Sequence, residues 1–308
     1  MIISITGSSG FIGKEISSYL IKKKYKINKI ISKKNNSNTE NFKLGNYFEE
    51  KNLDKILHVT DVLIHCMGAS VDNKKNKNYL NNINYLVTKK LAEKSANNNV
   101  KRFIFLSSIK VFGETCLINK PYTTYSKPNP YSKYGISKFN AEKALVEISN
   151  TSNLEVIIIR CPLVYGDKLS GNLLTLSKII KLNIPLPLDG INNKRSFLAI
   201  DNLINFIELS LNYKKNPIKK NEIFSLSDNE IISTTELIQK LSYSLNKKIR
   251  LFSLPKLIFK ILFYLLNKDN LYDSIFKNLY VKSSKAQNLF GWNPKISMEQ
   301  QLNKNKLN

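Results

Sequence analysis

The feature that most constrains the fold is an alternation of short β-branched apolar runs with helical patterns, which extends from Met1 to about Ser227. In chain order the runs are IISITG, KINKIIS, VLIHCM, RFIFLSS, EVIIIR, SFLAI and EIFSL. Such alternation predicts an α/β fold in which a doubly wound parallel sheet has helices on both faces. In sheets of this kind ligands bind beyond the carboxyl ends of the strands, so we expect the chemistry in the loops that follow them.

The alternation weakens after Arg160, where Pro and Gly residues mark loops around one helical stretch at 173–182. Further on, Ser233 and Glu236 have the spacing of a capping box, which predicts the start of another helix. A chain of 308 residues is long enough for one larger and one smaller lobe. We assign the sheet domain to 1–165 with return segments at about 195–227, and a smaller C-terminal lobe to 166–194 and 228–308.

The formal net charge of +25 raises the hypothesis of a nucleic-acid or anionic-membrane partner. Arginine is scarce, however, and the basicity comes almost entirely from lysine. The only arginines are Arg102, Arg160, Arg195 and Arg250. Surfaces that read phosphates or bases tend to use arginine, whose planar fork matches these groups bidentately. We therefore expect no nucleic-acid partner.

The cysteines and the N-terminus indicate the compartment. Three cysteines that lie far apart in the chain fit a reducing compartment better than a disulfide framework. The chain opens directly into the apolar run Met1–Ile5, without the basic region, long apolar core and cleavage site of a secretory signal. We expect a cytoplasmic protein.

The segment 251–266, LFSLPKLIFKILFYLL, is unusually apolar for a surface element. It is too short to span a membrane, which takes about 20 apolar residues, and Pro255, Lys256 and Lys260 interrupt it. We expect a buried helix of the second lobe. The alternative is an interfacial helix that gives weak association with a membrane surface.

A glycine-rich turn, TGSSGFIG at Thr6–Gly13, directly follows the first apolar run and directly precedes a helical pattern. Glycine permits a tight turn and lets backbone N–H groups approach a pyrophosphate, while the helix N-terminus adds the positive end of its dipole. This context predicts a dinucleotide-binding turn. The alternative is an ordinary loop between a strand and a helix.

Tyr134 and Lys138, in the stretch YGISK, are spaced to share one helix face. A tyrosine with a pKa near 10 is a poor base at neutral pH, but a nearby ammonium group favours the phenolate. Tyr131 is a competitor, yet the residue four positions after it is Gly135 and not lysine. We predict that Tyr134 is an acid/base group that Lys138 tunes; for this spacing alone, the alternative is a solvated helix face.

A third stretch, FLSSIKVFG, is an apolar run that ends in Ser107 and Ser108. A hydroxyl in such a place can hydrogen-bond a reacting oxygen and orient a substrate. A serine at a strand end can also be only a turn or cap residue.

In this order and spacing, the three stretches resemble the extended short-chain dehydrogenase/reductase superfamily, specifically its NAD-dependent epimerase/dehydratase family. The resemblance covers nearly the whole chain. It includes NYLVT at Asn84, CPLVYG at Cys161–Gly166, RSFLAIDNL from Arg195, and FGWNP at Phe290–Pro294.

This resemblance implies a Rossmann-type fold, an NAD or NADP cofactor, a UDP-sugar substrate, no metal, and a homodimer. It implies that the catalytic group is Ser108, Tyr134 and Lys138. The implied cofactor contacts are Gly7, Ser9, Gly10, Phe11, Ile12, Gly13, Ser32, Lys33, Met67, Gly68, Asn84, Tyr134 and Lys138. The implied substrate contacts are Ser108, Asn172 and Arg195. A guanidinium in a chain this poor in arginine also suggests bidentate phosphate binding at Arg195, against the alternative of a structural salt bridge.

The chain departs from the family pattern at two places. Relatives that prefer NAD often have an acidic residue after the second strand, where this chain has Ser32, Lys33 and Lys34. Cations there could accept a 2′-phosphate, so either NAD or NADP is expected. The second departure is Asn46, where the family usually has an aspartate near the adenine.

Ile109 and Lys110 bear on the reaction, because family dehydratases carry an Asp-Glu pair at this place. Dehydration therefore ranks third among the reactions. The stretches SSIKV, GN, PLPL and RSF look most like a branch that contains UDP-sugar 4-epimerases and 4-ketoreductases of 6-deoxy-N-acetylhexosamines. We predict an epimerase that transfers hydride at sugar C4, with the NAD(P)H-dependent ketoreductase as the alternative. A hypothesis from another class is a dinucleotide-binding protein without catalysis.

Overall fold

The computed structural model describes residues 1–31, 41–43, 50–69, 78–166, 169, 171–213, 220–266 and 269–304. The chain divides into two compact units. The first unit comprises Met1–Gly113, Lys127–Cys161 and Ile204–Ser225, and the second comprises Glu114–Ser126, Pro162–Leu203 and Leu226–Asn308. Each is described by itself.

The first unit contains a seven-stranded sheet in the order β3-β2-β1-β4-β5-β6-β9, and every neighbouring pair is parallel. The strands are β1 (Ile2–Thr6), β2 (Lys26–Ile31), β3 (Asn41–Lys43), β4 (Val62–His65), β5 (Arg102–Ser108), β6 (Glu155–Cys161) and β9 (Asn221–Ser225). The chain builds outward from β1 in one direction and then from β4 in the other. This reversal between β1 and β4 is the switch point of a doubly wound sheet, so the predicted fold class is confirmed.

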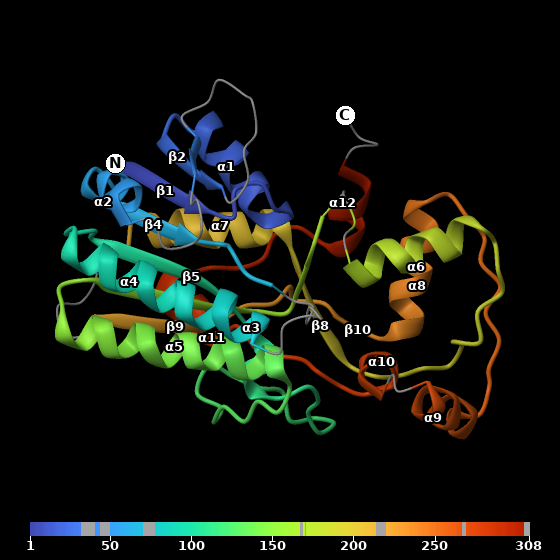
Figure 1. Ribbon diagram of the computed structural model, residues 1–308. Helices are drawn as coiled ribbons and strands as arrows, with labels where there is room; N and C mark the ends of the chain where they lie inside the picture. The colour runs from blue at the N-terminus through green and yellow to red at the C-terminus, as the bar shows by residue number, and fades with distance from the viewer. Residues whose placement is uncertain are drawn as a thin grey trace. The chain divides into compact units, whose positions relative to one another are not determined.

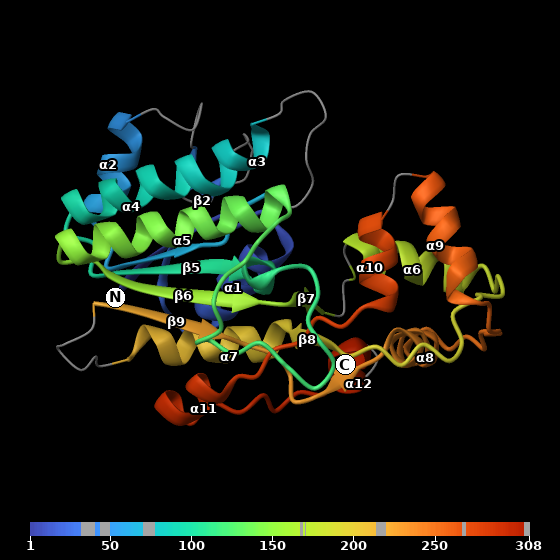
Figure 2. The same ribbon diagram turned by 90° about the horizontal axis from the view of Figure 1, so that it is seen from below.

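Helices cover both faces of this sheet, with α2, α4 and α5 on one face and α1 and α7 on the other (Figures 1 and 2). They are α1 (Phe11–Lys22), α2 (Glu50–His58), α4 (Val87–Asn97), α5 (Lys133–Thr151) and α7 (Ile200–Leu211), which enters the first unit at Ile204. Three short elements are α3 (Tyr79–Asn81), a π-helical turn η1 (Asn82–Leu86) and a 3-10 turn η2 (Ile109–Phe112).

The main core of the first unit lies between the sheet and helices α2, α4 and α5. Phe103 and Phe105 of β5 contribute to it together with Leu57, Leu91 and Leu145 from the three helices, and all five are at most 2% exposed. All seven residues of β5 are buried, as expected for a central parallel strand covered on both faces. Each large apolar side chain buried here stabilises the fold by about 1.5–3 kcal/mol.

The second unit contains a three-stranded sheet in the order β10-β8-β7, surrounded by helices. Its elements are β7 (Leu163–Tyr165), α6 (Gly171–Lys181), β8 (Arg195–Ala199), β10 (Ile231–Ile232), α8 (Thr234–Ser244), α9 (Lys256–Leu265), α10 (Asp269–Phe276), α11 (Ser284–Phe290) and α12 (Met298–Asn303). The predicted capping box is confirmed, because Ser233 Oγ accepts from the Glu236 N–H and the Glu236 carboxylate accepts from the Ser233 N–H.

The run SFLAI forms β8 and belongs to this small sheet, whereas we expected it in a return segment of the large one. β-branched and aromatic residues predict a strand but do not say which strand it pairs with. The contacts also assign 114–126 to the second unit. The predicted domain boundaries remain a prediction, and the two compact units differ from them at β8 and at 114–126.

The prediction of a buried helix at 251–266 is wrong. Helix α9 begins after Pro255, and Phe259 is its only buried residue. Within the part of the chain that the structure describes, no helix is both long and apolar enough to cross a bilayer.

Candidate active site

The glycine-rich turn connects β1 to α1 and depends on Gly7. Gly7 has φ +68°, in the left-handed region, and a Cβ atom there would lie 2.7 Å from the Met67 amide nitrogen. The Gly10 N–H donates to the Gly7 carbonyl at 3.0 Å, which closes the turn. Gly10 is also the N-cap of α1 and contributes no capping side chain. The first N–H groups of α1 can therefore serve an anion, as a pyrophosphate site requires.

The loop after β4 connects this turn to the other predicted cofactor residues. Met67 lies against Gly7, and a Cβ atom on Gly68 would lie 3.1 Å from Asn84 Oδ1 and 3.2 Å from Lys138 Nζ. Both side chains therefore occupy the space that a side chain at position 68 would need. The structure brings Gly7, Met67, Gly68, Asn84 and Lys138 together at the switch point of the sheet, where ligands of such folds bind.

Asn84 holds the loop after β4 against α5. It lies in the π-helical turn η1 and is fully buried. Its Oδ1 accepts from the Ala69 N–H at 2.8 Å, and its Nδ2 donates to the Ala69 carbonyl at 2.9 Å and to Ser137 Oγ at 3.0 Å. Single π-helical turns inside helices often occur at functional sites. This asparagine fixes the position of Gly68 relative to Lys138.

Lys138 is an almost fully buried ammonium group on α5. Its Nζ donates to the Leu106 carbonyl at 2.9 Å and lies 4.6 Å from the centre of the Phe105 ring. Burial lowers the pKa of Lys138 to about 8, while Cys161, Cys66 and Glu142 act in the opposite direction. Burial raises the pKa of both thiols to about 12. Since the thiols are neutral near pH 7, Glu142 is the charged group among these neighbours.

A buried ion pair that the sequence analysis did not single out lies one helical turn beyond Lys138. Glu142 Oε2 accepts from Arg160 Nη2 at 2.7 Å, and Glu142 Oε1 accepts from Arg160 Nε at 3.1 Å. Ser107 Oγ donates to the same carboxylate at 2.5 Å, and the guanidinium lies 4.7 Å from the centre of the Phe112 ring. The sequence does contain a hint of this ion pair. Arg160 lies within an apolar run, and the oppositely charged Glu142 follows Lys138 by four residues.

The two serines at the end of β5 therefore have different surroundings. Ser107 bonds Glu142, whereas Ser108 is the N-cap of η2 and its Oγ accepts from the Lys110 N–H at 3.2 Å. The capping role expected as the alternative for such a serine is thus present at Ser108. A hydroxyl that accepts one backbone hydrogen bond can still donate its own proton to another oxygen.

Tyr134 is the second residue of α5 and is half-buried. Ser132 caps this helix by accepting from the Gly135 N–H at 3.1 Å. A Cβ atom on Gly135 would lie only 2.6 Å from the Lys110 carbonyl oxygen, so the start of α5 packs directly on the turn that follows Ser108. The elements that carry Ser108, Tyr134 and Lys138 therefore converge at the carboxyl end of β5.

The predicted substrate residues Asn172 and Arg195 belong to the second unit. Asn172 is exposed in the first turn of α6. Arg195 begins β8, and its Nη1 donates to the Lys277 carbonyl at 3.2 Å. Burial lowers the pKa of Arg195, and the Glu114 carboxylate opposes this shift. Among the ion pairs of the described residues none involves Arg195, so the structural salt bridge considered as its alternative role is not seen there.

The structure describes only some of the remaining cofactor contacts that the sequence predicted. Ser9 is exposed in the glycine-rich turn, and Phe11, Ile12 and Gly13 form the start of α1. Ser32, Lys33, Lys34 and Asn46 lie outside the described residues, so the preference for NAD or NADP stays open. Within the described segments, no three His, Cys, Asp or Glu side chains gather as metal ligands would.

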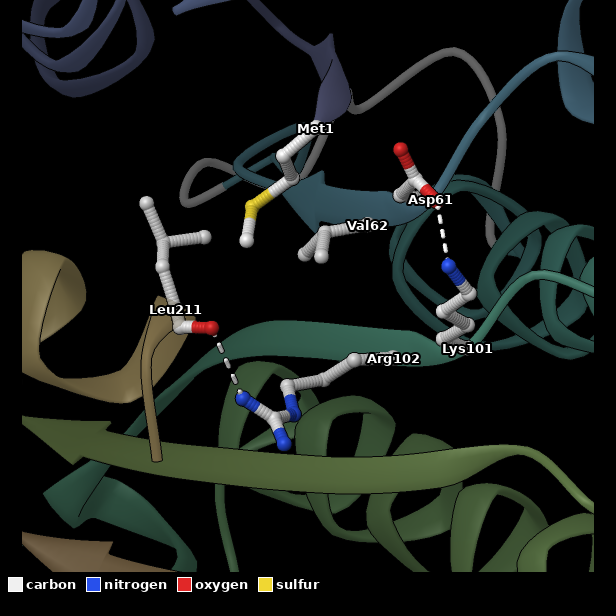
Figure 3. A pocket seen from close by; sticks show the side chains of 6 residues that line it. All are labelled: Met1, Asp61, Val62, Lys101, Arg102 and Leu211. Atoms are coloured by element: carbon white, nitrogen blue, oxygen red, sulfur yellow. Dashed lines mark hydrogen bonds and ion pairs between the residues drawn. The ribbon is translucent and has the colours of Figure 1, made fainter. Parts of the chain in front are cut away.

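A cavity of about 260 Å³ lies at the opposite ends of the strands from the candidate site, at the amino ends of β1, β4 and β5 (Figure 3). Its lining residues are Met1, Asp61, Val62, Lys101, Arg102 and Leu211. The polar groups in it already have partners: Lys101 pairs with Asp61 at 2.8 Å, and Arg102 donates to the Leu211 carbonyl at 3.1 Å. Ligands of doubly wound sheets bind at the carboxyl ends of the strands, so this cavity is not a candidate site.

Comparison of the sequence and the fold with known proteins points to the same kind of protein as the arrangement of residues at the switch point. A model of the NAD dependent epimerase/dehydratase family matches residues 3–226. The chain belongs to this family. It is 32% identical over 305 residues to a UDP-glucose 4-epimerase of Vibrio cholerae, covering 97% of this chain and 92% of that protein. It is 28% identical over 271 residues to a dTDP-4-dehydro-6-deoxyglucose reductase of Escherichia coli, covering 80% and 82%.

Solved structures share the fold. One is the UDP-glucuronic acid 4-epimerase of Bacillus cereus in complex with NAD, with a TM-score of 0.79 and 22% identity, covering 98% of this chain and 96% of that one. The predicted family and the Rossmann-type fold are confirmed. The family is one of NAD-dependent enzymes, and the relatives include both epimerases and a reductase.

Proposed function

We propose that the protein is an NAD(P)-dependent nucleotide-sugar epimerase that acts at C4 of a UDP-sugar. The observation that carries this proposal is the buried ammonium of Lys138, one helical turn from Tyr134 and packed beside Gly68 of the switch-point loop, where a Cβ atom would lie 3.2 Å from Lys138 Nζ. An ammonium in a poorly solvated place, close to a phenol, favours the phenolate. The same loop contacts Gly7, so the acid/base pair adjoins the glycine-rich turn.

The residues at the switch point fit a bound dinucleotide. The close approach at Gly7 and the uncapped start of α1 suit the pyrophosphate. A bound nicotinamide would supply the hydride acceptor and donor for the sugar. The chain's own residues hold it and move the proton.

In the proposed mechanism Tyr134 removes the proton of the sugar 4-hydroxyl and later returns it to the same oxygen. Lys138 stabilises the phenolate form of Tyr134, and the Ser108 hydroxyl donates to the reacting oxygen and aligns it. Epimerisation requires the oxidised sugar to turn over between the two transfers. Asn172 and Arg195 are proposed to bind the nucleotide diphosphate, with Arg195 giving a bidentate contact.

The second candidate is reduction of a 4-keto sugar, in which only the return half of this mechanism operates. The similarity to the Escherichia coli reductase supports it. Dehydration is less well supported, because Ile109 and Lys110 form η2 directly after Ser108 and provide no carboxylate. Among these options, the longer match to the Vibrio cholerae epimerase favours epimerisation.

The test starts from the purified protein without added cofactor. Denaturation followed by mass spectrometry identifies any dinucleotide that the protein carries, and fresh protein is incubated with UDP-glucose and, separately, other UDP-sugars. Release of a bound dinucleotide together with unaided interconversion of C4 epimers is expected. An empty protein that consumes a 4-keto sugar only with added NADPH or NADH would instead establish the reductase.

The role of Tyr134 is tested by Tyr134→Phe. We expect turnover to fall by about 10²–10⁴-fold while the dinucleotide is retained, because only the proton transfer is removed. Tyr131→Phe is the matched control, since Tyr131 is 58% exposed and three residues earlier in the chain. Full turnover by the Tyr134→Phe enzyme, or its loss in Tyr131→Phe alone, would show that the acid/base group is misassigned.

A further inference from the structure

Helix α9 turns an apolar face outward. Its inner side is held by Phe259, whose ring centre lies 5.0 Å from that of Phe276 in α10, beside which α9 runs in Figures 1 and 2. Five side chains on other sides of the helix are between 48% and 71% exposed, and they are Leu257, Ile258, Ile261, Leu262 and Leu265. At about 100° per residue these five occupy one sector of about 140°, whose centre lies about 130° around the helix from Phe259.

This arrangement differs from that of an ordinary surface helix. In a surface helix the apolar stripe faces the core and the polar residues face solvent. In α9 the packed side is narrow and the wide apolar side faces out. Leu254 and Leu266, which precede and follow the helix, are also 38% and 52% exposed. A contiguous apolar surface of this kind marks a site of interaction with another molecule or a membrane.

The charges around α9 indicate the chemistry of that partner. Lys256 and Lys260 are exposed on the flank of α9 between Phe259 and the apolar sector, and the preceding segment adds exposed Lys247, Lys248 and Arg250. The sequence contains no Asp or Glu between Glu236 and Asp269. Among the ion pairs of the described residues, none uses any of these five cations. On α9 itself the apolar face is therefore flanked by the positive charge of Lys256 and Lys260, which no described carboxylate pairs with.

We propose that α9 docks the protein on the surface of a membrane that contains anionic phospholipid. Leu257, Ile261 and Leu265 enter the boundary between headgroups and acyl chains, and the bordering lysines meet the lipid phosphates. A helix of ten residues is about 15 Å long, which suits a position in the plane of the interface and not across it. A second copy of the chain is a poorer occupant, because pairing two such faces would bring like charges together.

The proposal is independent of the catalytic function and is tested by sedimentation with vesicles. The full-length protein is mixed with vesicles of phosphatidylcholine, with and without phosphatidylglycerol, at low and at moderate salt. We expect sedimentation with the anionic vesicles, less with phosphatidylcholine alone, and a decrease as salt screens the charges. The double variant Ile261→Gln with Leu265→Gln should lower the partition coefficient by about tenfold or more, because it removes inserted apolar groups.

Two controls keep the result specific. Leu182→Gln changes a leucine that is 69% exposed in the second unit but outside α9, and it should sediment like the unchanged protein. Because the substituted side chains are already exposed, thermal unfolding should be nearly the same for all variants. A second readout is Ile261→Trp, whose fluorescence should shift to the blue on anionic vesicles; the chain's own Trp292 is buried.

Three outcomes would overturn the proposal. No sedimentation with anionic vesicles at low salt would show that lipid is not the partner. Equal sedimentation of the Ile261→Gln, Leu265→Gln protein would place any lipid contact on lysines elsewhere. A concentration-dependent dimer that the same double variant abolishes, without vesicle binding, would assign the face to a second copy of the chain.

Discussion

At residue scale, the proposed chemistry depends on what surrounds the ammonium group of Lys138. Lys138 has a carbonyl acceptor and an aromatic ring as close partners, and no carboxylate is among its hydrogen-bond acceptors in the described structure. Desolvation therefore dominates and brings the pKa to about 8. The group is still mostly protonated at neutral pH and loses its charge just above it. This makes Lys138 the group whose titration should limit activity on the alkaline side.

We predict that kcat/KM declines as the pH rises through about 8, because neutral Lys138 no longer stabilises the phenolate of Tyr134. Lys138→Met should lower kcat by about 10²–10⁴-fold at pH 7 and remove this decline from the remaining activity. The pH profile of turnover for both proteins checks this. An identical alkaline decline in Lys138→Met would mean that another group titrates there.

The pair Glu142 and Arg160 is predicted to act on stability. Arg160→Met leaves a buried carboxylate without its cation, so we expect the free energy of unfolding to fall by about 3–5 kcal/mol. The double variant Glu142→Met with Arg160→Met removes both charges of the pair and should lose less than Arg160→Met alone. Urea denaturation of the two variants measures the difference. A double variant that is less stable than Arg160→Met would contradict this account.

At the scale of elements, the site depends on how closely α5 approaches the turn after β5. We predict that Gly135→Ala displaces the start of α5, because its Cβ atom would lie 2.6 Å from the Lys110 carbonyl oxygen. Turnover should fall by at least about tenfold, as misplacement of about 1 Å near the chemistry can cost more than that. Ile136→Ala, on the exposed side of the same turn, is the control and should stay active. Equal kcat values for the two variants would rule out this role of the close contact.

The same elements show what the sequence could predict. The run RFIFLSS forms β5, as predicted, because a central parallel strand covered on both faces favours a continuous apolar stretch, here FIFL. The glycine turn likewise predicted Gly7 and the YGISK spacing predicted Lys138, two of the residues brought together at the switch point, whereas Met67, Gly68 and Asn84 came from the family resemblance. Three features were not predicted for one reason. The sheet that β8 joins, the outward face of α9 and the partner of Glu142 depend on contacts distant in sequence, whereas apolar periodicity reports only local burial.

At the scale of the whole molecule, each unit contains a buried titratable side chain that responds to acid in its own way. In the first unit His65 is fully buried between the hydroxyls of Thr6 and Thr88, and burial lowers its pKa to about 3. In the second unit burial raises the pKa of Asp228 to about 6, although Asn202 and Tyr165 donate hydrogen bonds to it. The two shifts have opposite signs and therefore opposite effects on stability.

We predict that between about pH 7.5 and 5 the first unit loses stability while Asp228 adds some to the second. His65 has a pKa of about 6.5 when unfolded and about 3 when folded, so its contribution is complete above pH 6.5 and declines as the pH falls. By pH 5 this amounts to about 2 kcal/mol. Asp228, with a folded pKa of about 6 and an ordinary value of 3.8, contributes fully below pH 3.8 and loses this as the pH rises through 6.

Hydrogen exchange measured unit by unit can separate the two effects, because it reports the free energy of opening for each set of amides. His65→Gln should remove most of the acid-dependent loss in the first unit without changing the pH dependence of the second. Asp228→Asn should flatten the pH dependence of the second unit and leave that of the first. If protection in the first unit falls equally with acid in the His65→Gln protein and in the unchanged one, the acid sensitivity of that unit comes from groups other than this buried histidine.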